Sequence, residues 1–189
     1  MKNIIEIKDN LDFEQVIEIQ KQSLIDFSKI SDLNYINEIQ NNGFFIAPYT
    51  LTEILEDKNK ILIGIKEENK ILAFVWVSEY IENHDYIWFD EKIKEKIFDK
   101  KIYKLKAIGV TKTKQGQGLA SELLKNLNLY LKDKSIKYLV GSIANNPIKN
   151  LASINFHKKN GFEEVAISPK HEYFEFKDYQ CSLFAKKLD

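Results

Sequence analysis

One segment in the second half of the chain constrains the fold more than any other. Residues 103–110 alternate between polar and apolar side chains and then become apolar, which is typical of a central strand. A polar loop that contains two glycines covers residues 111–118, and residues 118–133 then carry leucines at helical spacing. Residues 138–144 again have the pattern of a strand. A strand, a helix and a second strand in this order predict a parallel pair joined by a right-handed crossover.

Shorter patterns on both sides of this unit predict the other elements. Strands are expected over residues 4–7, 60–66, 71–77, 163–168 and 177–187; the turn 67–70 joins one hairpin, and the last two form an antiparallel pair. A first helix is expected to begin at an N-cap at Asp12, and a second, short helix is expected to end at residues 42–43. Further helices are expected over residues 50–55, 90–99 and 150–159. This order predicts an α/β fold, a mixed sheet of about seven strands with helices on both faces, in a single domain over residues 1–189.

The composition excludes several functional classes. The 28 basic residues balance 28 acidic residues, and this zero net charge argues against a nucleic-acid binder or a polybasic membrane protein. No apolar run approaches the roughly 20 residues that span a bilayer, and the first residues lack the apolar core of a signal peptide. A single cysteine, Cys181, excludes an internal disulfide and a cysteine-based zinc site, and no metal site is predicted. We therefore expect a cytoplasmic location.

The loop before the leucine-rich helix is the best candidate for a binding site. The first N–H groups of a helix lack intrahelical partners and attract anions, and Gly116 and Gly118 let the backbone approach such a group closely. Ala120 keeps the first turn thin, so a pyrophosphate is the expected ligand. The chain contains no arginine, so an anion site must use lysine, backbone N–H groups or a helix terminus. On its own, Gly-x-Gly at a helix start is more often a turn, and Ser121 replaces the third glycine of a dinucleotide fingerprint.

Two motifs resemble those of one known family. The segment 115–120, Gln-Gly-Gln-Gly-Leu-Ala, is similar to the Gln/Arg-x-x-Gly-x-Gly/Ala motif of the GCN5-related N-acetyltransferases (GNAT). Residues 150–162 resemble the Asn-x-x-Ala/Ser-x-x-x-Tyr-x-x-x-Gly-Phe helix of that family, and also the form found in phosphinothricin-type amino-acid acetyltransferases. With the strand order, the resemblance covers nearly the whole chain. It implies the GNAT-like acyl-CoA N-acyltransferase fold and the use of acetyl-CoA as cofactor.

The resemblance also implies where acetyl-CoA binds. The strands 103–110 and 138–144 would separate and admit the pantetheine arm, with Gly109 and Gly141 near the separation, and the amide of Val110 or its neighbour would polarise the thioester carbonyl. For both glycines a tight helix–strand contact is the alternative, and for Asn150 the alternative is helix capping. The implied cofactor-binding residues are Ile108, Gly109, Val110, Gln115, Gly116, Gln117, Gly118, Leu119, Ala120, Ser121, Asn150 and Ser153.

The catalytic residues of the resembled family are matched less completely. His157 stands where many relatives carry a tyrosine, so the resemblance implies a general acid or thiolate stabiliser there, with a structural role as the alternative. Relatives often carry a glutamate or histidine base on the strand before the loop, but the corresponding positions here are Lys104 and Lys106. These lysines either attract an acidic group of the acceptor substrate or lie on a solvated strand face.

Candidates for the missing base lie around the start of the long connection over residues 80–102. Glu79, His84 and Asp85 are titratable residues there, with exposed loop charge as the alternative, and water could instead remove the proton. Trp88 could form a wall of the acceptor pocket or pack the connection down. No histidine is suggested at a fixed spacing from Cys181, so a covalent acyl-cysteine route is not expected.

These observations favour an acetyl-CoA-dependent N-acetyltransferase that transfers an acetyl group directly to a primary amine of a small molecule, a peptide or a protein. Because the strand carboxylate is missing, a non-catalytic GNAT-fold module that senses acyl-CoA is the alternative, and a nucleotide-phosphate binder of another fold is a third interpretation. We expect neither a nucleic-acid nor a membrane partner. Dimers are common in the resembled family, so a homodimer is consistent with this interpretation.

Overall fold

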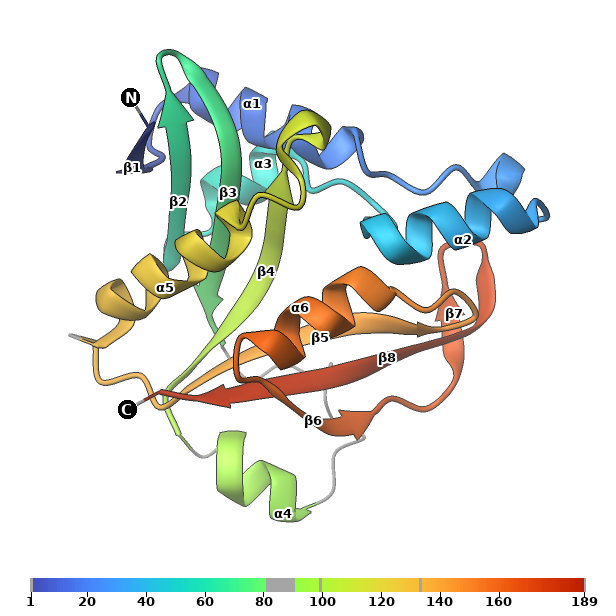
Figure 1. The fold of residues 1–189 in the computed structure, drawn as a ribbon. Helices are drawn as coiled ribbons and strands as arrows, with labels where there is room; N and C mark the ends of the chain where they lie inside the picture. Colours follow the sequence, from blue (N-terminus) through green and yellow to red (C-terminus); the bar gives the residue numbers. More distant parts are fainter. Residues whose placement is uncertain (1, 81–90, 99, 133, 189) are drawn as a thin grey trace.

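One mixed sheet runs through the structure, a computed structural model that describes residues 2–80, 91–98, 100–132 and 134–188. The strand order is β1-β2-β3-β4-β5-β8-β6, with β7 paired to β8 (Figure 1). Among the strands that the structure describes, only β4 and β5 pair in parallel, and they are the pair that the sequence predicts. The strands are β1 (Lys2–Glu6), β2 (Lys60–Glu67), β3 (Lys70–Glu79), β4 (Ile102–Val110), β5 (Tyr138–Asn146), β6 (Glu163–Ile167), β7 (His171–Tyr173) and β8 (Phe176–Lys187).

Helices cover both faces of the sheet, so the predicted fold class is confirmed (Figure 1). Two apolar clusters fill the two sides: α5 and α6 contribute to one, and α1 and α3 contribute to the other. The helices are α1 (Asn10–Lys21), α2 (Leu33–Asn42), α3 (Leu51–Glu56), α4 (Glu91–Ile93, continued by π-helical turns over Lys94–Phe98), α5 (Leu119–Lys132) and α6 (Leu151–Lys159).

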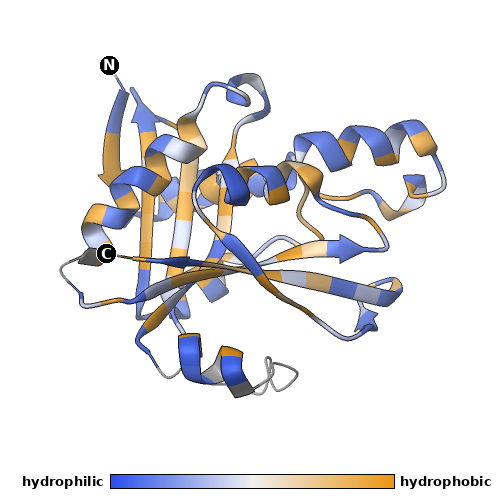
Figure 2. Cartoon of the chain, turned by 60° about the horizontal axis from the view of Figure 1, so that its bottom comes forward, coloured by the Kyte–Doolittle hydropathy of each residue, from blue (hydrophilic) through white to orange (hydrophobic). Residues whose placement is uncertain are grey.

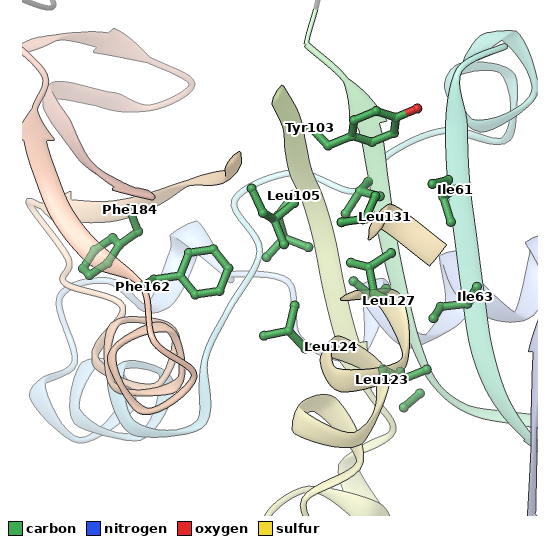
Figure 3. Close-up of a cluster of buried hydrophobic side chains, with 14 of the residues drawn as sticks. Ile61, Ile63, Tyr103, Leu105, Leu123, Leu124, Leu127, Leu131, Phe162 and Phe184 are labelled. Atoms are coloured by element: carbon green, nitrogen blue, oxygen red, sulfur yellow. The ribbon is translucent and has the colours of Figure 1, made fainter. Parts of the chain in front are cut away.

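The leucine stripe of α5 forms the centre of the larger cluster. Leu123, Leu124 and Leu127 are almost fully buried, as the helical spacing predicts. Figure 3 shows α5 over β3, between β2 and β4, with Leu105 on the side of the Phe162 and Phe184 rings. Apolar residues gather along the strands in Figure 2, while the helices carry many polar residues. This packing fixes the start of α5 relative to the end of β4.

Two local predictions differ from the structure. The predicted N-cap of the first helix is wrong, because Asp9 caps α1 and accepts a hydrogen bond from the Asp12 N–H at 2.8 Å. The Asp12 carboxylate is buried and instead binds the Lys66 ammonium on β2 at 2.8 Å. The short strand β7 was not predicted; its three residues are exposed and carry no buried face that a pattern could reveal.

The parallel pair β4–β5 is hydrogen-bonded along only part of its length. Pairing covers Ile102–Lys104 on β4 and Tyr138–Val140 on β5, and the two strands then diverge (Figure 1). Beyond that point β4 stays paired with β3, and β5 stays paired with β8. The sheet therefore divides into two halves that remain joined at one end, as the family resemblance implies.

The buried ion pair between α1 and β2 can be tested against the cap of α1. Replacing Lys66 with Met leaves the Asp12 carboxylate buried without its partner, and we expect this to lower the unfolding free energy by about 3 kcal/mol. Asp9→Ala removes only a helix cap and is expected to cost about 1 kcal/mol. Denaturant unfolding measures both variants. Equal losses in the two variants would contradict the expectation that the Asp12–Lys66 ion pair stabilises the fold more than the Asp9 cap does.

Candidate functional site

A deep cleft occupies the gap between the separated strands. Its volume is about 1040 Å³, and three parts of the molecule line it. The loop over residues 114–121, leading into α5, forms one end, and residues 105–110 of β4, residues 141–144 of β5 and the inner side of α6 form the middle. The segment that follows α2 and aromatic residues of β7 and β8 form the other end. A pocket of this size and depth is suited to a cofactor-sized ligand.

The glycines of the loop have the geometry of a backbone anion site. Gly116 has φ +75° and Gly118 has φ +83°, which are values that side chains other than glycine rarely adopt. A Cβ atom placed on either glycine meets no other atom within 4 Å, so the space in front of the loop is open. The first N–H groups of α5 have no acceptor within the helix, and Lys114 adds a positive charge to the cleft. The loop therefore suits a diphosphate.

Apart from Gln117, every residue predicted to bind the cofactor lines this cleft. The Gln117 side chain is exposed, and its amide donates to the Thr113 carbonyl at 3.4 Å. The Ser121 hydroxyl is held by the Asn160 amide at 3.2 Å, which ties the start of α5 to the end of α6. The sequence motif therefore identifies residues that the fold brings together, while their roles in binding stay predictions.

The two strand glycines have different surroundings. A Cβ atom on Gly109 would lie 2.5 Å from Cε1 of Phe74, so this glycine permits close packing, which is the alternative noted above. A Cβ atom on Gly141 would lie 3.1 Å from Nε2 of His157. Gly141 directly follows the last residue of β5 that pairs with β4. Its missing side chain therefore opens the narrow end of the gap toward His157.

Asn150 is occupied by structural hydrogen bonds. Its carbonyl oxygen accepts from the Ser153 N–H at 3.1 Å and caps α6, and its amide donates to the Phe44 carbonyl at 3.0 Å. Asn150 therefore caps α6, while its predicted contact with the cofactor stays a prediction. The residue also fixes α6 to the segment after α2, so it shapes the cleft whether or not it contacts a ligand.

His157 is buried, with 3% of its surface exposed, and its ring is held by one hydrogen bond. Nδ1 lies 2.7 Å from the Ser153 carbonyl, and because a carbonyl oxygen only accepts, Nδ1 carries the proton. Burial lowers the pKa of His157 to about 4, and the bond to Ser153 offsets only part of this shift. At neutral pH the ring is thus uncharged with an unprotonated Nε2. The role of His157 as a general acid stays a prediction, and this ring geometry does not favour it.

Of the predicted bases and acceptor-site residues that the structure describes, Glu79 and Lys104 do not line the cleft and Lys106 does. Glu79 lines a smaller cavity of about 360 Å³, where Lys104 also lies, and its carboxylate is 3.9 Å from the Lys101 ammonium. Lys106 lines both cavities. His84, Asp85 and Trp88 lie outside the described residues, so their predicted roles stay predictions.

Sequence reasoning missed the one carboxylate that does line the cleft. Among the described lining residues, Glu53 of α3 is the only acidic one. Its Oε2 accepts from the Thr50 N–H at 2.7 Å and from the Thr50 hydroxyl at 2.8 Å, which forms a capping box. The Thr-x-x-Glu spacing is visible in the sequence, but it predicts only a helix start. Tyr173, Phe174 and Tyr179 complete this end of the cleft.

Comparison with known proteins agrees with this geometry. Residues 15–162 match the model of a family described as "Acetyltransferase (GNAT) family". The chain belongs to the GNAT acetyltransferase family. A GNAT acetyltransferase takes its acetyl group from acetyl-CoA and acts on an amine acceptor. The open glycine loop and the separated strands fit that cofactor, because they offer backbone N–H groups to a diphosphate and a narrow slot to its arm.

Solved structures share the fold of this GNAT acetyltransferase at low sequence identity. The ribosomal-protein-S18-alanine N-acetyltransferase from Escherichia coli aligns over 100% of this chain and 95% of its own, with 15% identity and a TM-score of 0.66. NAA60 from Arabidopsis thaliana, solved with a bisubstrate analogue, aligns over 99% and 98%, with 12% identity and a TM-score of 0.70. A putative phosphinothricin N-acetyltransferase aligns over 100% and 99%, with 15% identity and a TM-score of 0.63.

This GNAT acetyltransferase has neither a match among the curated proteins nor a membrane-spanning helix among its described residues. None of the curated proteins matches it in sequence. Across the part of the chain that the structure describes, no helix is both long and apolar enough to cross a membrane.

The loop assignment can be tested with two matched glycine variants. Asn tolerates positive φ better than other side chains, so Gly118→Asn should keep the fold while its side chain intrudes on the anion site. We expect its affinity for CoA to fall at least tenfold in calorimetry. Gly161→Asn is the control, because Gly161 has φ +82° but lies outside the cleft. An unchanged affinity in Gly118→Asn would contradict the loop site.

The buried state of His157 predicts a pH dependence of stability. Because its pKa falls from 6.5 to about 4 on folding, the unfolded chain binds the proton more tightly. The contribution of His157 to the unfolding free energy is fully present above pH 6.5. It decreases by on the order of 3 kcal/mol as the pH falls toward 4. The difference in unfolding free energy between the wild type and His157→Phe should change by this amount over that range. A difference independent of pH would contradict the burial of a neutral ring.

Proposed function

We propose that this enzyme transfers the acetyl group of acetyl-CoA directly to a primary amine of a small molecule or a peptide. The observation that carries the proposal is the continuity of the cleft. One cavity joins the glycine loop, the slot between β4 and β5, and an aromatic end that contains a carboxylate. A donor and an acceptor can therefore enter from opposite ends and meet between the strands, which is the arrangement that direct transfer needs.

The donor half of the cleft supplies backbone hydrogen bonds. Acetyl-CoA supplies the acetyl group in activated form, as a thioester. Beyond Lys104, β4 has no strand partner on the side that faces β5. The Lys106 carbonyl accepts from the Tyr49 hydroxyl at 3.3 Å and the Val110 carbonyl accepts from the Gln115 amide at 3.4 Å, so the other main-chain groups there can bond to a pantetheine arm. A β4 amide near Val110 would donate to the thioester oxygen and stabilise the charge that develops on it.

Nothing in the cleft favours a covalent acyl-cysteine. Cys181 of β8 is not among the described residues that line it. Burial raises the pKa of the Cys181 thiol, although hydrogen bonds from Ser168 and Ser142 and the charge of Lys104 partly oppose this. A thiol in this state is a poor nucleophile at neutral pH. This supports direct transfer.

The acceptor half of the cleft suits a positively charged amine. Glu53 offers a carboxylate to an ammonium group and would take its proton before the neutral amine attacks the thioester. The Tyr173 ring, which stacks on Tyr179 with the centroids 4.8 Å apart, lies at the same end, and an aromatic face also attracts cations. Glu53 is close enough to Tyr173 to affect it: burial raises the pKa of Tyr173, and the charges of Cys181 and Glu53 add to the rise.

A non-catalytic acyl-CoA sensor is the second candidate. It is favoured by Lys104 and Lys106, which occupy the strand positions where relatives often carry a base. Glu53 lies in the same cleft as the glycine loop and can replace that missing carboxylate, so we place catalysis first.

The experiment measures thiol release from acetyl-CoA with and without a panel of small amines and peptides. We expect amine-dependent release, and Glu53→Gln should lower kcat/KM at least tenfold by removing the carboxylate charge. A glutamine at this position still completes the capping box, so the helix start is retained. Glu14→Gln on α1 is the control, since Glu14 is exposed and lines neither cavity. CoA binding without release for any amine would favour the sensor.

A further inference from the structure

Gln20 of α1 is a buried amide that lies behind the acceptor end of the cleft. Its side chain is 0% exposed, and it is not among the described residues that line either cavity. Its Oε1 accepts a hydrogen bond from the Tyr49 N–H at 3.1 Å, whereas its Nε2 has no partner among the residues that the structure describes. Tyr49 itself lines both cavities. Gln20 is therefore connected to the cleft through the main chain of Tyr49.

The stability of α1 does not explain an amide at this position. Phe13, Val16 and Ile19 share the buried face of the helix, and all three are apolar members of one core cluster. A buried donor without a partner costs free energy, and an apolar side chain of similar length would fill the same space without that cost. Residues that break the packing pattern in this way are expected at functional sites. The bond to Tyr49 is thus the feature of Gln20 that calls for a functional explanation.

The bond from Gln20 fixes the peptide that leads directly into α3. The Tyr49 N–H donates to Gln20, and the next N–H along the chain, that of Thr50, donates to Oε2 of Glu53 at 2.7 Å. The Tyr49 hydroxyl donates to the Lys106 carbonyl at 3.3 Å, which holds the ring in place but not the peptide. The position of the Glu53 carboxylate therefore depends on where the main chain of Tyr49 lies.

The rest of this segment is attached to α1 without help from Gln20. The Phe45 N–H donates to the Ser23 carbonyl at 2.8 Å, and the Phe45 carbonyl accepts from the Ile25 N–H at 2.9 Å. These bonds join main-chain atoms, so a change of side chain at Gln20 leaves them in place. Loss of the Gln20 bond would thus release the main chain at Tyr49 while the segment before it stays attached.

We propose that Gln20 is a positioning residue for acetyl transfer, which holds the start of α3 so that the Glu53 carboxylate stays at the cleft. The inference rests on the proposed function, in which Glu53 takes the proton of the acceptor. A peptide N–H that loses its buried acceptor has to turn toward water to find another. Without Gln20, the Tyr49 peptide would therefore shift, and Thr50 and Glu53 would move with it.

A pair of variants at Gln20 tests this role in catalysis. Gln20→Met removes the hydrogen bond and the unpaired amide but keeps the length of the side chain. We expect kcat/KM for the amine to fall about tenfold, because the base is misplaced, while the affinity for CoA stays unchanged in calorimetry. Gln20→Glu keeps an accepting oxygen, and burial favours its neutral acid form, so it should recover most of the loss. An unchanged kcat/KM in a folded Gln20→Met protein would overturn the proposal.

Gln15 on the same helix supplies a matched control. Its Oε1 accepts from the Ile71 N–H at 2.9 Å, so Gln15→Met removes the same kind of bond from a residue that lines neither cavity. We expect this variant to lower the unfolding free energy without changing kcat/KM. An equal fall in kcat/KM in Gln15→Met and Gln20→Met would show a general effect of α1 stability and would also overturn the proposal.

A double variant shows whether Gln20 acts through Glu53. Since Glu53→Gln already removes the carboxylate charge, adding Gln20→Met should lower kcat/KM little further. If the two losses multiply, Gln20 acts by another route and the proposal is wrong. If the wild type releases no thiol with any amine, the proposed function fails instead, so the two failures can be distinguished.

Amide hydrogen exchange tests the bond itself without depending on activity. We expect the Tyr49 N–H to exchange slowly in the wild type and in Gln20→Glu, and much faster in Gln20→Met. The Phe45 N–H, whose acceptor is the Ser23 carbonyl, should stay protected in all three proteins. An unprotected Tyr49 N–H in the wild type, or equal protection in Gln20→Met, would overturn the proposal whatever the kinetics.

Discussion

The interruption of hydrogen bonding between β4 and β5 is the constraint on which the rest of the molecule depends. Each strand remains paired on its outer side, β4 with β3 and β5 with β8, so neither can rotate to satisfy the groups that face the gap. Unpaired main-chain groups need a partner, either water or a ligand. A sheet divided in this way is therefore a receptor for an extended molecule that carries its own amide groups, and packing beneath the gap keeps it open.

That packing was largely predictable, because it follows from local patterns. The leucines of α5 lie at helical spacing, and the strands around the helix alternate, so the strand–helix–strand unit and its position in the sheet follow from residues that are close in the chain. The predicted cap at Asp12 failed for the opposite reason. Asp9 and Asp12 are both suitable caps, and the partner that selects Asp12 for burial, Lys66, lies 54 residues away on β2. Exposed β7 gave no pattern at all.

The candidate site, too, was predictable only where it depends on residues that are close in the chain. The glycine loop is local, and its motif identifies residues that do line the cleft. The carboxylate at the other end could not be found in this way, because Glu53 is recognisable only as part of a capping box until the fold brings it near Tyr173. Glu79 is at the end of a strand next to the site, yet it lines only the smaller cavity, whereas Glu53 lines both. The position of a residue along a strand predicts the edge of the sheet at which it lies, but it does not predict the cavity that its side chain lines.

The charged groups at the two ends of the cleft indicate the end from which each substrate enters. One end offers helix N–H groups and Lys114 to an anion, and the other offers Glu53 and aromatic faces to a cation. Between them, β4 main-chain groups and the side chains of Ser142 and Ser153 are among the polar groups that line the slot. An ammonium group cannot attack a carbonyl, so it must lose its proton before it enters the slot. Glu53 stands at that boundary, and the neutral ring of His157, which lies deeper, has its only proton bound to Ser153. On the proposed function, deprotonation belongs to the acceptor end and binding of the thioester arm belongs to the slot, so the two tasks fall to residues from different halves of the chain.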